Sequence, residues 1–365
     1  MKKETRRRKK ETNARTMVQY VVEWLPRINR IAVVVEGWER VQIESVEGTF
    51  LSILGDDGQR EDISLPVEVE ENVNLPYEFE KGRNDLEYIV KIRSKSSEKY
   101  DNLIMSLPDG KWTKEDLCLD PEFSIECLQC KQKIINKDNC RVLNNMPSEF
   151  WMELMDYWHC HKPDVGETKF GSYSQYETLK PSENEILIGN SFFQGTPATL
   201  KNAVLEKDSN MLLCKNCSVV LGQTTAGPLY KLYKWKLRLR RNGMTYHFPP
   251  ELDVMLSLIS VVKANSCRYA LLKSGGKRLL VWIFSFDLGV TLTGNKQLER
   301  SMKLLYTDND ATTNHCLERQ NAEELDIQET TFHAFYDGLQ RVNALLPSNM
   351  KVMGEWSISY VSLVE

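Results

Sequence analysis

The chain has 365 residues, with 47 Lys and Arg against 51 Asp and Glu, and its formal net charge is −4. Apolar residues make up 41% of it and charged residues 27%, a balance that excludes wholesale disorder and allows two or three domains. No apolar run approaches the roughly 20 residues of a membrane-spanning helix. No apolar stretch follows the charged N-terminus, as it would in a secretory signal. We therefore expect a soluble intracellular protein without a membrane contact.

Residues 1–16 form a basic leader. They carry eight Lys or Arg and two Glu, a charge of +6 that leaves −10 on the rest of the chain. The leader has no apolar residues that would dock onto a core, so we predict that it is disordered. Such a run is typical of a nuclear-import signal or a nucleic-acid contact, and equally of a solvated tail.

Residues 17–122 are predicted to form a β-rich N-terminal domain. Apolar or alternating runs at 18–24, 31–35, 41–43 and 49–53 favour strands, and Gly and Pro residues separate them. Their spacing of about ten residues favours a small sandwich or barrel.

The remaining chain divides into a middle region, 123–228, and an α+β C-terminal domain, 229–365. In the middle region we expect a helix from Pro147 to about Trp158 and two short strands within Glu185–Gln194. In the last domain the pattern predicts strands at 232–240, 268–273, 279–286 and 356–363, and helices at 251–264, 297–306 and 332–346. The predicted fold class is α+β with a β-rich front half.

Two C-x-x-C pairs, Cys127 with Cys130 and Cys214 with Cys217, give the strongest chemical signal. Two residues between cysteines let a tight turn direct both sulfurs to one point, and two such turns supply four thiolates for tetrahedral zinc. The 83 residues between the pairs exceed the roughly 15–20 of an ordinary zinc ribbon. A metal can close so long a loop, because loop entropy grows slowly with length. The alternatives are two unrelated pairs or a redox pair.

Other thiols and imidazoles lie between the pairs. His159, Cys160 and His161 follow the predicted helix and are either further metal ligands or core residues. Cys140 lies in a polar loop, where Lys137 and Arg141 would favour its thiolate, the nucleophilic form. It is either a reactive thiol or an incidental surface residue.

A basic strand is predicted near residue 237. Alternation places Lys234, Lys236, Arg238 and Arg240 on one face, opposite apolar residues. Such a row can contact phosphates or an acidic partner protein. The charge of −10 on the rest of the chain argues against broad nucleic-acid affinity. The basic face is therefore either merely solvated, as most such faces are, or the contact for an acidic partner protein.

Five motifs in order carry a family resemblance. They are C-x-x-C at Cys127, Pro-Ser-Glu-x-Trp at Pro147, Trp-x-Cys-His at Trp158, Ile-Gly-x-Ser-Phe-Phe at Ile188, and C-x-x-C-x-x-x-Leu-Gly at Cys214. From Met17 to the C-terminus the chain resembles the HECT-like E3 ubiquitin ligase family, whose animal members are named for binding a ubiquitin-conjugating enzyme. The match is closest to a budding-yeast member.

The resemblance implies a ubiquitin ligase that acts through a cysteine thioester. It also implies association with the endonuclease of nuclear pre-mRNA 3′-end cleavage and polyadenylation, and a location in nucleus and cytoplasm. It assigns the four paired cysteines to zinc, with Cys160 and His161 as part of the motif. Unlike true HECT ligases, the chain has no cysteine in its C-terminal tail, residues 356–365.

Two functions follow from these residues. A ligase needs an exposed, activated thiol, for which Cys140 is the first candidate and Cys160 the second. A zinc-braced adaptor or chaperone would instead bind the metal-dependent endonuclease without ubiquitin chemistry.

Overall fold

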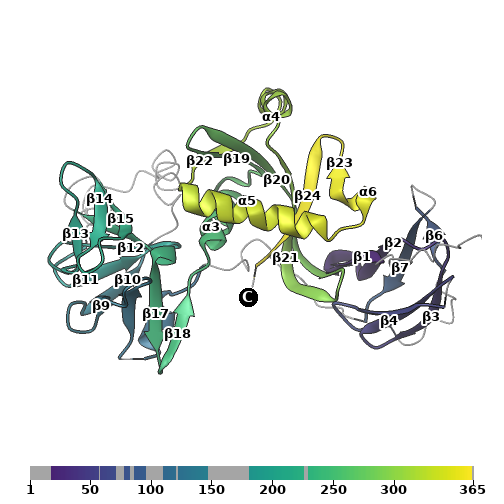
Figure 1. Ribbon diagram of the computed structural model, residues 1–365, viewed down its shortest axis with the longest axis horizontal. Coiled ribbons are helices and arrows are strands. Elements are labelled where there is room, and N and C mark those ends of the chain that lie inside the picture. The colour runs from purple at the N-terminus through teal and green to yellow at the C-terminus, as the bar shows by residue number, and fades with distance from the viewer. Residues whose placement is uncertain are drawn as a thin grey trace, which may run out of the picture. The chain divides into compact units, whose positions relative to one another are not determined.

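The computed structural model describes residues 18–56, 58–70, 78–82, 86–95, 110–120, 122–146, 181–225 and 229–363. The chain forms two compact units, each assembled from segments that are distant in sequence (Figure 1). Unit 1 comprises Met1–Asp101, Ser285–Lys303 and Arg341–Glu365, and unit 2 comprises Asn102–Phe284 and Leu304–Gln340. The predicted consecutive division at residues 16, 122 and 228 is not confirmed by this arrangement.

Three long elements contribute residues to both units. They are β20 (Lys277–Leu292), β21 (Lys296–Thr307) and α5 (Glu329–Ala344). The other elements of unit 1 are β1 (Gln19–Leu25), β2 (Arg30–Glu36), β3 (Val41–Glu47), β4 (Phe50–Gly55), β5 (Arg60–Ser64), β6 (Glu80–Lys81), β7 (Glu87–Arg93), α6 (Ser348–Lys351), β23 (Val352–Met353) and β24 (Trp356–Ser362), with a 3-10 turn at Pro26–Ile28.

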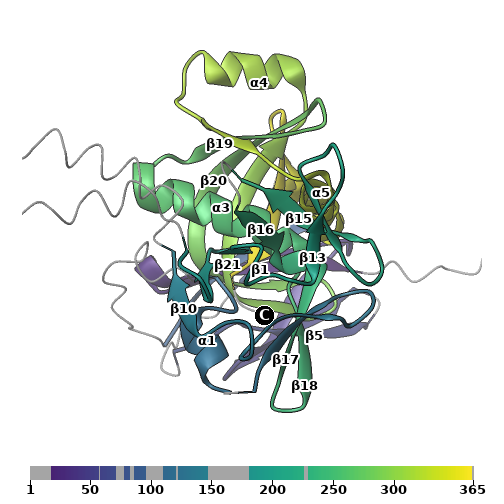
Figure 2. The same ribbon diagram turned by 90° about the vertical axis from the view of Figure 1, so that its left-hand side faces the viewer.

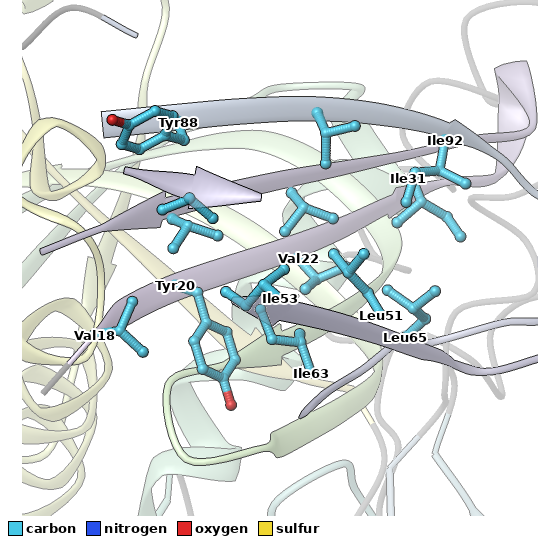
Figure 3. Close-up of a cluster of buried hydrophobic side chains, with 14 of the residues drawn as sticks. Val18, Tyr20, Val22, Ile31, Leu51, Ile53, Ile63, Leu65, Tyr88 and Ile92 are labelled. Carbon is cyan, nitrogen blue, oxygen red and sulfur yellow. The ribbon is translucent and has the colours of Figure 1, made fainter. Parts of the chain in front are cut away.

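Unit 1 is built on a sheet in which β1 pairs with β2 on one side and with β20 on the other, both antiparallel. A three-stranded sheet, β3-β4-β5, supplies the other wall of its core. Alternate β1 residues Tyr20, Val22 and Trp24 are buried in this core. Figure 3 shows Tyr20 and Val22 next to Leu51 and Ile53 of β4. The alternation read from the sequence therefore produces the predicted β-rich packing of the N-terminal segment.

Unit 2 holds the two cysteine pairs. One sheet has the order β10-β11-β12-β16-β15-β14-β13 and a second has the order β18-β17-β8-β9. Figure 2 labels β10, β13, β15 and β16 of the first sheet and β17 and β18 of the second. The elements of unit 2 are α1 (Lys114–Cys118), β8 (Ser124–Cys127), β9 (Lys133–Asn136), β10 (Val142–Asn145), β11 (Glu185–Ile188), β12 (Phe192–Gly195), β13 (Ala203–Leu205), β14 (Met211–Cys214), β15 (Val220–Thr224), β16 (Tyr230–Tyr233), β17 (Leu237–Arg241), β18 (Met244–His247), α3 (Pro250–Asn265), β19 (Tyr269–Ser274), α4 (Asp310–Leu317) and β22 (Glu323–Asp326).

Most predicted elements are confirmed, including α3, α5 and the strands of the N-terminal segment. Two are wrong. The expected helix at 297–306 is strand β21, and the expected single strand at 232–240 is broken by a 3-10 turn at Lys234–Lys236. The predicted helix from Pro147 lies outside the described residues. Among the helices of the described ranges, none is both long and apolar enough to span a membrane.

Candidate metal centre

The two C-x-x-C pairs adopt the same turn. Cys127 ends β8, its N–H donates to Gln132 O at 2.8 Å, and its carbonyl accepts from Lys131 N at 3.0 Å. Cys214 ends β14, its N–H donates to Val219 O at 2.8 Å, and its carbonyl accepts from Ser218 N at 2.8 Å. In each turn the residue after the second cysteine has a left-handed backbone, with φ 65° at Lys131 and 57° at Ser218. Gly222 lies within β15 and is not part of the second turn.

These two turns bring the four sulfurs together. Cys127 Sγ lies 3.7 Å from Cys217 Sγ, and Cys130 Sγ lies 3.6 Å from Cys214 Sγ. All four sulfurs lie within 4.8 Å of one another. A tetrahedral ion with metal–sulfur bonds of about 2.3 Å requires sulfur–sulfur edges of about 3.8 Å. The pairs therefore share one site whose size and donors fit a tetrahedral metal ion.

The electrostatics of the four thiols differ. Burial raises the pKa of Cys127 to about 12 and also raises the pKa of Cys214. At Cys130 burial acts in the same direction, but hydrogen bonds from the Asn216 side chain and the Gln132 backbone outweigh it and lower its pKa to about 6. Buried thiolates need a compensating cation, and a bound divalent metal would supply it.

Neighbouring strands hold each turn in place. Cys127 lies opposite Leu237 of β17, and Cys214 lies opposite Ala203 of β13. Asn202 joins the two turns, because its Nδ2 donates to Lys133 O at 2.8 Å and its carbonyl accepts from Lys215 N at 2.9 Å. The sequence analysis missed Asn202, since nothing in its local pattern points to a contact across 69 residues.

A buried ion pair lies directly beside the first turn. Arg238 Nε and Nη2 donate to Glu126 Oε2 at 2.9 and 2.5 Å, and Ser124 Oγ donates to Glu126 Oε1 at 3.0 Å. The side chains of Arg238 and Glu126 are 16% and 3% exposed. This pair fixes the register of β17 against β8 at the residue before Cys127. The charge at position 126, between Ile125 and Cys127, was the available sequence signal.

Cys140, the predicted nucleophile, is buried. Only 5% of the residue is exposed, and its thiol donates to Val142 O at 3.3 Å. Burial raises its pKa to about 11, although backbone hydrogen bonds at Val142 and Ile186 act in the opposite direction. The exposed, activated thiol expected at this position is therefore not observed. Its role as nucleophile stays a prediction.

The remaining candidate ligands and thiols lie elsewhere. His159, Cys160 and His161, including the second-choice nucleophile, lie outside the described residues. Cys118, Cys267 and Cys316 are free thiols that are not members of the four-cysteine cluster.

The predicted basic face at 234–240 is wrong, because the turn at Lys234–Lys236 interrupts the strand. Lys234 is 1% exposed, and its Nζ donates to Lys111 O at 2.6 Å and Asn190 O at 3.1 Å. Lys236 is half-buried, Arg238 is committed to Glu126, and Arg240 alone of the four is exposed. Alternation survives only within β17, where Leu237 and Leu239 are buried.

Lys234 gives the stability of the folded protein a testable dependence on pH. Burial lowers its pKa to about 7, against an opposing effect of Asp116, whereas the unfolded chain holds the proton up to about 10.4. Between these values the unfolded state binds more protons, so stability rises with pH. We expect the stability of the wild type relative to Lys234→Met to increase from pH 7 to 9, by at most about 1.4 kcal/mol per pH unit. Urea unfolding of both proteins at each pH measures it.

The matched control is Lys236→Met, two residues away, which removes a lysine that is half-buried instead of fully buried. A pH-independent difference for Lys234→Met would show that this ammonium is not desolvated in the folded protein.

Comparison with known proteins relates this chain to a protein family. The model of the family described as HECT-like ubiquitin-conjugating enzyme (E2)-binding matches residues 23–358, which include all four clustered cysteines. The chain is 66% identical over 348 residues to Uncharacterized protein YJR141W of Saccharomyces cerevisiae, covering 95% of this chain and 100% of that one.

More distant relatives carry a ligase name. The chain is 23% identical over 270 residues to a protein of Mus musculus named as an E3 ubiquitin-protein ligase, covering 65% of this chain and 70% of the relative. It is 26% identical over 164 residues to the Homo sapiens protein of the same name, covering 39% and 40%. No solved structure matches the chain. Because the family match extends over most of its length, the chain belongs to the HECT-like ubiquitin-conjugating enzyme (E2)-binding family.

Proposed function

We propose that this protein binds a ubiquitin-conjugating enzyme and promotes ubiquitin transfer from it. The observation that carries the proposal is the family match over residues 23–358. The mouse and human relatives, whose printed name is E3 ubiquitin-protein ligase, support it. Within this function the four-cysteine cluster holds zinc, because four thiolates are the donor set of structural zinc sites. Four protein ligands leave no position for a substrate, so the ion braces the fold.

The chemistry available to the described thiols favours an adaptor route. In a thioester route the Cys140 thiolate would attack the E2–ubiquitin thioester, forming a new thioester and releasing the E2 thiolate. A buried thiol with a pKa of about 11 is poorly suited to this attack. In an adaptor route the protein holds the charged E2, and ubiquitin passes directly to the acceptor amine.

Cys140→Ala separates the two routes. We expect the variant to keep E2 binding and ubiquitin transfer, because burial withholds this thiol from the reaction. The measurement is a discharge assay with purified E2–ubiquitin, analysed on gels with and without reducing agent. Cys140→Ser is the size-matched control. A reducible ubiquitin adduct on the wild type that disappears in Cys140→Ala would restore the thioester assignment.

The E2-binding proposal has its own test. Purified full-length protein is immobilised and offered a panel of purified ubiquitin-conjugating enzymes, with binding measured by interferometry. At least one should bind with an affinity that bovine serum albumin does not approach. Absence of binding to every E2 would overturn the proposal.

An association with the pre-mRNA 3′-end cleavage endonuclease, and with it a location in nucleus and cytoplasm, rests on the sequence resemblance. We propose the endonuclease as a second partner of this protein, and binding it is compatible with the adaptor route. The test is co-purification of the endonuclease with the tagged wild type and with Cys140→Ala. Equal recovery with the variant would show that the buried thiol has no part in that contact.

A further inference from the structure

One face of strands β13, β14 and β15, next to the Cys214 turn, carries apolar side chains that are exposed or half-buried. In strands β13, β14 and β15, Val204 lies opposite Leu213, and Leu213 lies opposite Val220. Val204 is 38% exposed and Leu213 and Val220 are half-buried. Met211, two residues before Leu213 on the same face of β14, is also 38% exposed. We call these four residues the knuckle face.

The opposite face of the same strands is largely buried, although Leu205, which lies opposite Leu212, is 49% exposed. Ala203, Leu212, Cys214 and Leu221 are buried there, with exposures of 4% or less. A strand that buries one side normally carries polar residues on the other. Here Val204, Leu213 and Val220 make the outward side largely apolar as well, with Gln223 opposite Met211, and β13 is the last strand of its sheet (Figure 2). Such a row on an exposed sheet edge is the pattern of an interaction surface.

The charged residues around the knuckle face indicate what kind of partner it would bind. Lys131, Lys133, Lys201 and Lys215 are exposed beside the two cysteine turns, and Asn202 brings the backbone at Lys133 and Lys215 close together. Residues 127–133 and 211–225 contain no Asp or Glu. The acidic residues of the β13–β14 hairpin, Glu206 and Asp208, lie at the end away from Cys214, where Glu206 N–H donates to Met211 O at 2.9 Å.

The local charge is positive even after the metal is counted. Four thiolates and one divalent ion carry −2, which the four lysines exceed. Residues 17–365 together carry −10, so the basic surroundings of this face contrast with the charge of the chain outside the leader. A basic, apolar surface complements a partner with apolar side chains set among carboxylates.

From this juxtaposition we infer that the knuckle face, with its rim of lysines, is the surface that docks the E2, through an acidic patch of that enzyme. The inference rests on the proposed function and adds to it the place and the chemistry of the contact. The metal then serves binding indirectly, because it fixes the Cys214 turn, which connects β14 with β15.

The test compares E2 binding of the full-length wild type, Val204→Asp and the double variant Lys201→Glu with Lys215→Glu. We expect Val204→Asp and the double variant each to weaken E2 binding at least tenfold. The double variant should also flatten the dependence of E2 binding on salt between 50 and 300 mM. Val352→Asp is the matched control, since Val352 is a 53% exposed strand residue in unit 1. Circular dichroism and zinc content confirm folding, and Met211→Glu gives an independent variant at an exposed position.

The outcomes separate two failures. If the wild type binds an E2 and the knuckle-face variants bind it equally well, the inference is overturned and the proposed function stands. If the wild type binds no E2, both fail. If the wild type self-associates in solution and Val204→Asp makes it monomeric without affecting E2 binding, the face is a contact between copies, which also overturns the inference.

Discussion

Removing the metal is expected to unfold the cysteine-bearing part of unit 2. The turns at Cys127 and Cys214 come from segments more than 80 residues apart, and the four sulfurs between them lie within 4.8 Å of one another. Structural zinc contributes about 10–16 kcal/mol of apparent binding free energy in small domains. Without it, Cys127 and Cys214 remain as buried thiols in two turns with no common ligand. We expect Cys214→Ser to lower the melting temperature by about 10 °C or more.

The measurement combines zinc content by mass spectrometry with thermal unfolding. The wild type should hold one zinc per chain and Cys214→Ser none, and a strong chelator should reproduce the shift. Hydrogen exchange should rise in β8, β14 and β15 while the core around Tyr20 and Ile53 in unit 1 stays protected. Cys118→Ser, at an exposed thiol outside the cluster, is the control and should match the wild type. A metal-free wild type with the same melting temperature would contradict a bracing role.

The four-cysteine cluster was predictable because C-x-x-C encodes its own turn. The two intervening residues and the left-handed residue that follows act locally, so each half of the site forms wherever the segment is placed. What the sequence could not specify was the support between the halves. Asn202 donates to Lys133 O, which lies 69 positions earlier in the chain, and accepts from Lys215 N. Such a bridge depends on the pairing of β13 with β14.

The wrong secondary-structure predictions have the same origin in tertiary context. Residues 297–306 have apolar spacing typical of a helix, yet they form β21 as the partner of β20 across the tight turn at Gly294 and Asn295, both left-handed. Pairing within the sheet, which buries Met302 and Leu304, outweighs a helix preference of a few tenths of a kcal/mol per residue.

Two side chains that the sequence pattern placed at the surface, those of Lys234 and Cys140, are buried. Lys234 was assigned to a solvent face by alternation, but the chain turns at this residue and its ammonium is held by two backbone carbonyls. Cys140 has basic neighbours in sequence, but it ends a turn whose N–H groups bond back to Asn136 O, and its thiol is directed inward. Neighbours in sequence do not determine burial, and burial sets the pKa of both groups.

Arg238→Ala is expected to destabilise unit 2 by about 3 kcal/mol. The substitution leaves the Glu126 carboxylate buried at 3% exposure with the Ser124 hydroxyl as its remaining side-chain donor among the contacts described above. Breaking one side of a buried ion pair costs about 3–5 kcal/mol, and the lower end applies because Arg238 is 16% exposed. Since Glu126 precedes Cys127, the loss should also speed zinc release to a chromogenic chelator. Urea unfolding and stopped-flow absorbance measure the two effects.

Arg240→Ala is the matched control, because Arg240 lies two residues along the same strand with its side chain exposed, and we expect a change within about 0.5 kcal/mol. A second variant distinguishes the ion pair from simple packing. If the cost of Arg238→Ala is the stranded charge of Glu126, then Arg238→Met combined with Glu126→Met should be more stable than Arg238→Met alone, since apolar residues of similar volume need no partner. A double variant less stable than the single one would instead show that Glu126 holds β8 and Cys127 in place independently of Arg238.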